Sequence, residues 1–148
     1  MRKASFVIGL CMIFALALNV MDLAGFEDGH LKKSHPDTMK AIGSARASLQ
    51  RNILGGDGAA AATDGEKLAK LFNSLVPMYE EKGEFLAPAV EMAKSAASAS
   101  AAAATAAKAG DMDGALEAHG NIVAGCRGCH GQFREKAPDG SYRFKSPD

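Results

Sequence analysis

The chain has 148 residues, of which 47% are hydrophobic and 23% are charged. Its 17 basic and 17 acidic residues balance, so the formal net charge is zero at pH 7. This length suits one domain with one hydrophobic core, and the balanced charge excludes the strongly basic composition that is typical of nucleic-acid-binding proteins.

The N-terminus has the layout of a secretory signal peptide. Arg2 and Lys3 precede an uncharged apolar run, and Ala15 and Ala17 form a small-x-small cleavage site near its end. Polar residues interrupt the run before the roughly 20 apolar residues that a membrane-spanning helix needs. We therefore expect an exported protein that is released into the bacterial periplasm, with an uncleaved membrane anchor as the alternative.

A first helix is predicted over residues 36–53. Pro36 suits a first helical turn, Ser34 or His35 lies at the N-cap, and apolar residues recur with helical spacing. The glycines that follow should end this helix, and the alanines at 59–62 are compatible with either helix or loop. His35 itself is expected at the protein surface.

A second helix is predicted over residues 64–82, with Thr63 or Asp64 as its N-cap and a stripe of leucine, phenylalanine and valine as its buried face. Pro77 should kink this helix or end it early, because proline removes a backbone donor and clashes with the preceding turn.

A third helix is predicted over residues 85–109. Its many alanines favour a helix that neighbouring helices can approach closely, and a flexible linker is the alternative. Gly110 is the expected C-cap.

A fourth helix begins near Asp111 or Asp113 and carries the strongest functional motif of the chain. Cys126, Cys129 and His130 form C-x-x-C-H, which is the attachment motif of c-type haem. Residues three and four apart lie on one side of a helix, so two thioether bonds and one axial imidazole can reach the same haem.

Three other interpretations of the motif stay open. A structural zinc site needs four ligands, and the sequence has no second Cys or His cluster that would complete one. A thioredoxin-like dithiol needs a βαβ context, which the predicted helices do not provide. The third interpretation is a plain structural pair of cysteines. Cys11 lies in the signal peptide and is discarded with it, so no disulfide framework is expected.

Four helices with short connections and no convincing strand predict an all-α fold, an antiparallel four-helix bundle with haem covalently bound on the C-terminal helix. After this helix, the sequence predicts a turn and an extended segment. The expected divisions are a signal peptide (1–17), an N-terminal segment (18–35), a four-helix domain (36–136) and a C-terminal tail (137–148). The motif shares a face of the fourth helix with apolar residues and one histidine: Ala115, Leu116, His119, Ile122, Val123 and Phe133.

A C-x-x-C-H motif on the last of four helices, continued as Gly131-Gln132-Phe133-Arg134, resembles the cytochrome c prime family, the class II c-type cytochromes. The match is most specific over residues 120–136 and looser over residues 36–136. The resemblance implies one haem c enclosed by the bundle, with His130 as the proximal axial ligand. Arg127 and Arg134 match basic positions of the family motif, and a cation beside His130 would raise the reduction potential.

On the other side of the haem, the resemblance implies a residue of the first helix. This residue is apolar in the five-coordinate branch of the family and a methionine in the low-spin branch. Met39 matches the position and is the expected distal axial ligand, with core packing as its alternative role. His119 stands where the family usually has an apolar or aromatic residue, and we expect it to be a hydrogen-bonded core residue.

We therefore expect a periplasmic monohaem c-type cytochrome that carries single electrons between redox partner proteins. The alternative is a five-coordinate haem protein that binds nitric oxide or carbon monoxide. A peroxidase-like enzyme would need a distal acid and base, which the sequence does not identify. The resemblance also implies a homodimer that forms through the first two helices.

Overall fold

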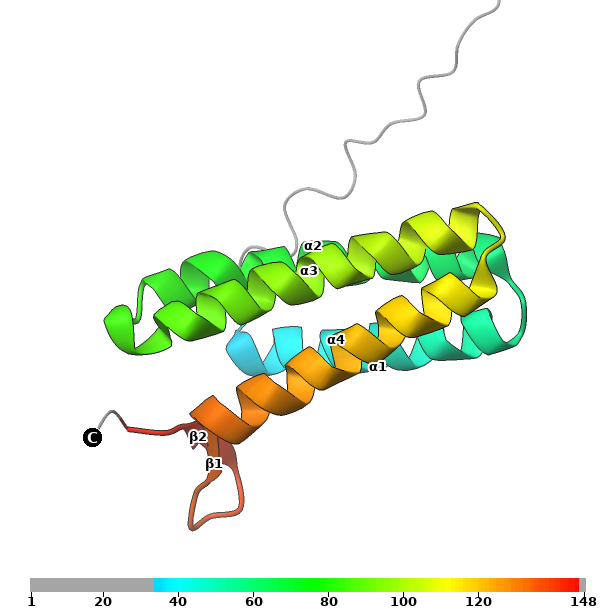
Figure 1. Cartoon of the computed structure of the whole chain (residues 1–148). Coiled ribbons are helices and arrows are strands. Elements are labelled where there is room, and N and C mark those ends of the chain that lie inside the picture. Colours follow the sequence, from blue (N-terminus) through cyan, green and yellow to red (C-terminus); the bar gives the residue numbers. More distant parts are fainter. Residues whose placement is uncertain (1–33, 147–148) are drawn as a thin grey trace, which may run out of the picture.

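The computed structural model describes residues 34–146, which form four helices followed by a small β-hairpin (Figure 1). The elements are α1 (His35–Leu54), α2 (Gly58–Glu80), a 3-10 turn η2 (Glu84–Leu86), α3 (Ala87–Lys108), α4 (Met112–Phe133), β1 (Arg134–Lys136) and β2 (Tyr142–Phe144). The expected signal peptide and nearly all of the segment 18–35 lie outside these residues. Within residues 34–146, no helix has the length and apolar character needed to cross a membrane.

α1 occupies the range that the sequence predicts. Ser34 is the N-cap, and its side chain accepts a hydrogen bond from the backbone N–H of Asp37. This satisfies one of the donors that the first turn of a helix leaves free. Ile42, Leu49 and Ile53 are buried on the inner face at helical spacing, which confirms the predicted amphipathic helix.

α2 begins at Gly58, so the predicted N-cap at Thr63 or Asp64 is wrong. The cap is Asp57, whose carboxylate accepts a 3.0 Å hydrogen bond from the backbone N–H of Ala60. The alanines at 59–62 are therefore helical. The glycines before them indicated a loop, but Asp57 closes the connection within a few residues.

Pro77 lies inside α2 and does not end it at once. The helix continues to Glu80, slightly short of the predicted end at Lys82. Pro77 is exposed, and so is Asn73, whose carbonyl loses its helical partner to the proline. Water can solvate that carbonyl, so the last turn of the helix is tolerated.

α3 is a continuous helix, and the linker alternative is wrong. The 3-10 turn η2 leads into it, and Pro88 occupies its first turn. Its C-cap is Ala109, followed by Gly110 with a φ of 77°, a left-handed conformation that glycine adopts without strain. The predicted C-cap, Gly110, is thus one residue beyond the observed C-cap, Ala109.

The alanines of α3 bring this helix close to α2. Gly65 of α2 faces the α3 backbone so closely that an added Cβ would lie 2.9 Å from the nitrogen of Ala104 and 2.9 Å from the carbonyl oxygen of Ser100. Gly58 makes a similar approach, since a Cβ there would lie 2.7 Å from the carbonyl oxygen of Ala107. Small residues at these positions allow the two helices to pack backbone against backbone.

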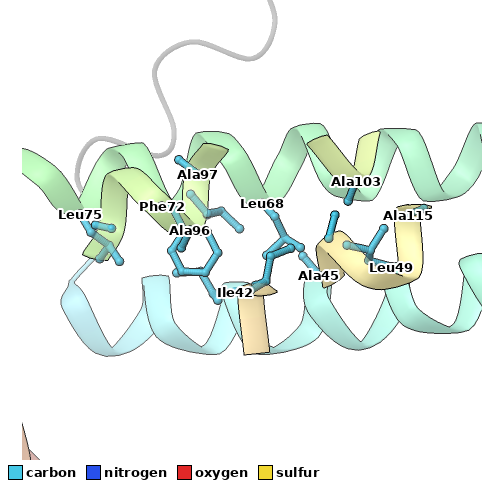
Figure 2. Close-up of a cluster of buried hydrophobic side chains, with 14 of the residues drawn as sticks. Ile42, Ala45, Leu49, Leu68, Phe72, Leu75, Ala96, Ala97, Ala103 and Ala115 are labelled. Carbon is cyan, nitrogen blue, oxygen red and sulfur yellow. The ribbon is translucent and has the colours of Figure 1, made fainter. Parts of the chain in front are cut away.

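The core is filled from both sides of the bundle. Figure 2 shows Ile42 and Leu49 of α1 and Leu68, Phe72 and Leu75 of α2 packed against small residues: Ala96, Ala97 and Ala103 of α3 and Ala115 of α4. α4 packs chiefly on α3, and its contact with α1 is sparse. The bundle is therefore tight between α2 and α3 and loose between α1 and α4.

The turn and the extended segment predicted after the fourth helix are present, but they form a β-hairpin, which corrects the expectation of no convincing strand. Arg134 pairs with Phe144 and Lys136 with Tyr142 in an antiparallel register. The two strands are too short for an alternating pattern to stand out in the sequence. Gly140, with a φ of 84°, lies in the connecting turn. The fold is thus all-α with a short β-hairpin at its end.

Gly65→Ala should destabilise the protein by about 1–3 kcal/mol, because the added methyl group meets backbone atoms of α3 that cannot rotate away. Gly43→Ala is the matched control. Gly43 is an exposed helical position in α1 with nothing within 4 Å of an added Cβ, so alanine should stabilise the helix by about 0.5–1 kcal/mol. Urea denaturation followed by circular dichroism measures both, and equal stability of Gly65→Ala and wild type would contradict the packing described here.

Candidate haem site

The C-x-x-C-H motif lies in the last turns of α4, which is unbroken from Met112 to Phe133. Asp111 starts this helix by accepting a 2.9 Å hydrogen bond from the backbone N–H of Gly114. Cys126, Cys129 and His130 are each half-buried, and both thiols are free of disulfide bonds. The two sulfurs and the imidazole are therefore available on one side of a regular helix.

The motif side chains are neutral at pH 7. Burial raises the pKa of the Cys126 and Cys129 thiols, although the charge of Arg46 opposes the rise at Cys126. Burial lowers the pKa of His130, and the charge of Arg134 lowers it further. Since a neutral imidazole is the form that binds metals, these shifts suit His130 to the role of axial ligand.

Arg134 is close enough to the motif to act on it. It is the C-cap of α4, and its backbone N–H donates to the carbonyl of His130. Its guanidinium lies over the ring of Tyr142, 4.2 Å from the centroid, which fixes the charge beside the helix end. Arg127 is exposed on the outer face of α4.

α1 runs antiparallel to α4, and the hairpin connects the start of α1 to the end of α4. Phe144 pairs with Arg134 at the C-cap of α4, and its ring packs on His35. The charge of His130 accordingly acts on the pKa of His35, and Arg46 acts on the pKa of His119 further along the bundle. Met39 lies one helical turn along α1 from His35.

Met39 is half-buried and packs against the hydrophobic core. It lies about one helical turn further along α1 than His35, which contacts the hairpin at the end of the bundle that carries the motif.

His35 is not a surface residue, which corrects the prediction. Its Nε2 atom lies 3.2 Å from the hydroxyl of Tyr79, and its ring lies 4.8 Å from that of Phe144. The ring centroids of Tyr79 and Phe144 are 6.0 Å apart, and the two rings are perpendicular. Lys82 covers the Phe144 ring from 5.5 Å. We call His35, Tyr79 and Phe144 the aromatic cluster.

The aromatic cluster borders the motif. Tyr79 is only 2% exposed, and burial raises the pKa of its hydroxyl well above the ordinary value, with further contributions from Cys129 and Cys126. The sequence offered one weak signal for Tyr79, its spacing of four from the buried Leu75. It offered none for Phe144, because only the hairpin brings that residue back to the bundle (Figure 1).

His119 is buried, as predicted, but only partly hydrogen-bonded. Burial lowers its pKa, the charge of Arg46 lowers it further, and a hydrogen bond to the Arg46 backbone opposes the shift. Its Nε2 atom has no hydrogen-bond partner within the described part of the chain. Leu116 lies on the face of α4 that the sequence predicts to be buried, but it is 39% exposed.

The donor set fits haem better than a metal ion held by protein alone. Among residues 34–146, no three or more His, Cys, Asp or Glu side chains are grouped to hold a metal ion. A porphyrin supplies four ligands to its iron, so His130, alone or with one further residue, would complete the coordination. The free thiols and the neutral imidazole match the three bonds that a c-type haem makes with its protein.

No family model, curated protein or solved structure matches this chain. The structure shows an all-α protein of four helices packed as an up-and-down bundle, with the C-x-x-C-H motif on the last helix.

Proposed function

We propose that this protein is a c-type cytochrome that carries single electrons through one covalently bound haem. The observation that supports this most is the half-buried set of Cys126, Cys129 and His130 on one face of the last helix, with both thiols free and the imidazole neutral. The placement of this motif on a four-helix bundle is also the pattern of the cytochrome c prime family.

In this proposal, Cys126 and Cys129 form the thioether bonds and His130 provides the proximal axial ligand. The haem supplies the iron, which alternates between ferric and ferrous states when it is bound. The protein side chains set the polarity and the charge around the iron. Burial beside Tyr79 lowers the local polarity, and the Arg134 charge disfavours the additional positive charge of the oxidised state.

The position of the motif suits exchange of electrons with another protein. Cys129 and His130 are half-buried near the end of α4 rather than in the middle of the core, so the site lies close to the surface. Redox partner proteins are the expected partners, a periplasmic location follows from the signal-like N-terminus, and a homodimer follows from the family resemblance.

A second function is favoured by one observation, the packing of Met39 against the hydrophobic core, where methionine serves as a core residue rather than as a ligand. If no side chain of α1 binds the iron, the distal position stays open, and the protein binds nitric oxide or carbon monoxide instead of carrying electrons. A five-coordinate, high-spin spectrum distinguishes this function from the first.

Wild-type protein produced in a host with a cytochrome c maturation system should gain the mass of one haem and keep its colour in acidified acetone. The double variant Cys126→Ala with Cys129→Ala should lose its pigment under the same treatment, because no thioether bond can form. Cys11→Ala is the control and should keep its haem. A colourless wild type would refute the proposed function.

Arg134→Gln should lower the reduction potential by an amount on the order of tens of millivolts, because a cation beside His130 destabilises the oxidised haem. Arg127→Gln removes the same charge from another exposed position, and because Arg127 is not among the charges that act on His130, it should change the potential less. Spectroelectrochemical titration measures both potentials. Equal shifts in the two variants would show that Arg134 has no special role.

A further inference from the structure

His35 begins α1 and is held in a defined orientation there. Ser34 caps the helix directly before it, and Pro36 follows it in the first turn. The Phe144 ring packs on its imidazole at 4.8 Å and the Tyr79 ring lies at 5.8 Å. The imidazole is therefore held by aromatic rings from α2 and β2.

The hairpin places His35 at the end of the bundle that carries His130. Phe144, whose ring packs on His35, pairs with Arg134, and Arg134 is the C-cap of α4. The charge of His130 is accordingly among the influences that lower the pKa of His35, after burial and the charge of Lys82. Met39 lies one helical turn further along α1.

The Nε2 atom of His35 lies 3.2 Å from the hydroxyl of Tyr79, a side chain that is only 2% exposed. Tyr79 belongs to the hydrophobic core, and Cys126 and Cys129 pack against that core. The nitrogen that could bind a metal is therefore the one that faces buried residues, at the end of the bundle that carries the motif.

We propose that His35, and not Met39, is the distal axial ligand of the haem that Cys126, Cys129 and His130 hold. This inference rests on the proposed function and specifies its distal side. Coordination uses the lone pair of Nε2, so the Tyr79 hydroxyl gives up its hydrogen bond to that nitrogen. Met39 keeps its place as a core residue beside the thioether bonds.

Two imidazole ligands have consequences that one imidazole and one thioether do not. Both oxidation states are low-spin and six-coordinate, so carbon monoxide does not bind readily to the reduced protein. The reduction potential is lower than that of a haem with methionine as its sixth ligand. The far-red absorption band of thioether-ligated ferric haem is absent.

Optical and electron paramagnetic resonance spectra of the full-length holoprotein test this proposal, with and without carbon monoxide. Wild type should be low-spin, without the thioether band. His35→Ala should become high-spin and bind carbon monoxide, and added imidazole should restore the low-spin spectrum. Met39→Leu is the matched control on α1; it keeps the side-chain volume and should leave the wild-type spectrum unchanged.

His35→Phe is a second variant that retains the ring packing which His35→Ala loses. Phenylalanine keeps a ring against Phe144 and Tyr79 but has no ligating nitrogen, so it should also give a high-spin spectrum. If either His35 variant fails to fold, the wild-type spectrum still distinguishes methionine from imidazole as the sixth ligand, because the thioether band reports methionine ligation directly.

Three results would overturn the proposal. A wild-type thioether band that Met39→Leu removes would assign the ligand to Met39. A high-spin wild type that binds carbon monoxide would leave the iron five-coordinate. A low-spin spectrum that persists in His35→Phe would exclude His35. A colourless protein refutes the haem itself, so failure of the proposed function is distinguishable from failure of this inference.

Discussion

Gly58 and Gly65 allow α2 to approach the backbone of α3 more closely than any larger residue would permit, and the shape of the bundle depends on this contact. The alanines of α3 cannot fill a wide space between helices, so the large side chains of α1 and α2 occupy the core instead. α4 then packs on α3 and remains loosely associated with α1. The close packing of α2 on α3 stabilises the bundle, and the sparse contact between α1 and α4 is where a ligand could be accommodated.

The C-x-x-C-H motif occupies that loose side. Its three reactive side chains are half-buried, and burial keeps the thiols protonated and the imidazole neutral. The hairpin that follows α4 returns Phe144 to the same end of the bundle, where it packs on His35 and faces Tyr79. The end of α4 is thereby flanked by aromatic side chains, which would shield a haem bound to the motif from water on one side.

The distal side determines which function such a site has. A sixth ligand from the protein keeps the iron low-spin and favours electron transfer, whereas an open position favours the binding of small gases. α1 presents two side chains with ligating atoms at this end, and their depth along the helix separates them. His35 contacts the hairpin at the end of the bundle that carries His130, and Met39 lies one helical turn further along α1. If a haem is bound as proposed, the choice between these two ligands would affect its reduction potential.

Local patterns in the sequence determined the helices and the chemistry of the motif. α1, α3 and α4 could be predicted because capping residues, alanine content and apolar spacing act within a few residues, and C-x-x-C-H specifies its own geometry once it lies on a helix. The start of α2 was not predicted, because the glycines around Asp57 indicate a loop locally, and the need for glycine at position 58 is explained by its close approach to the backbone of Ala107.

The aromatic cluster also depends on tertiary structure alone. His35, Tyr79 and Phe144 are far apart in the sequence and carry no shared pattern, so nothing local indicates that they meet. Their contact requires the antiparallel alignment of α1 with α4 and the return of the hairpin, which are long-range features. The sequence by itself therefore determined the motif that we propose to hold a haem, and only the packing of the helices decided which side chains lie beside that motif, because their contacts join residues distant along the chain.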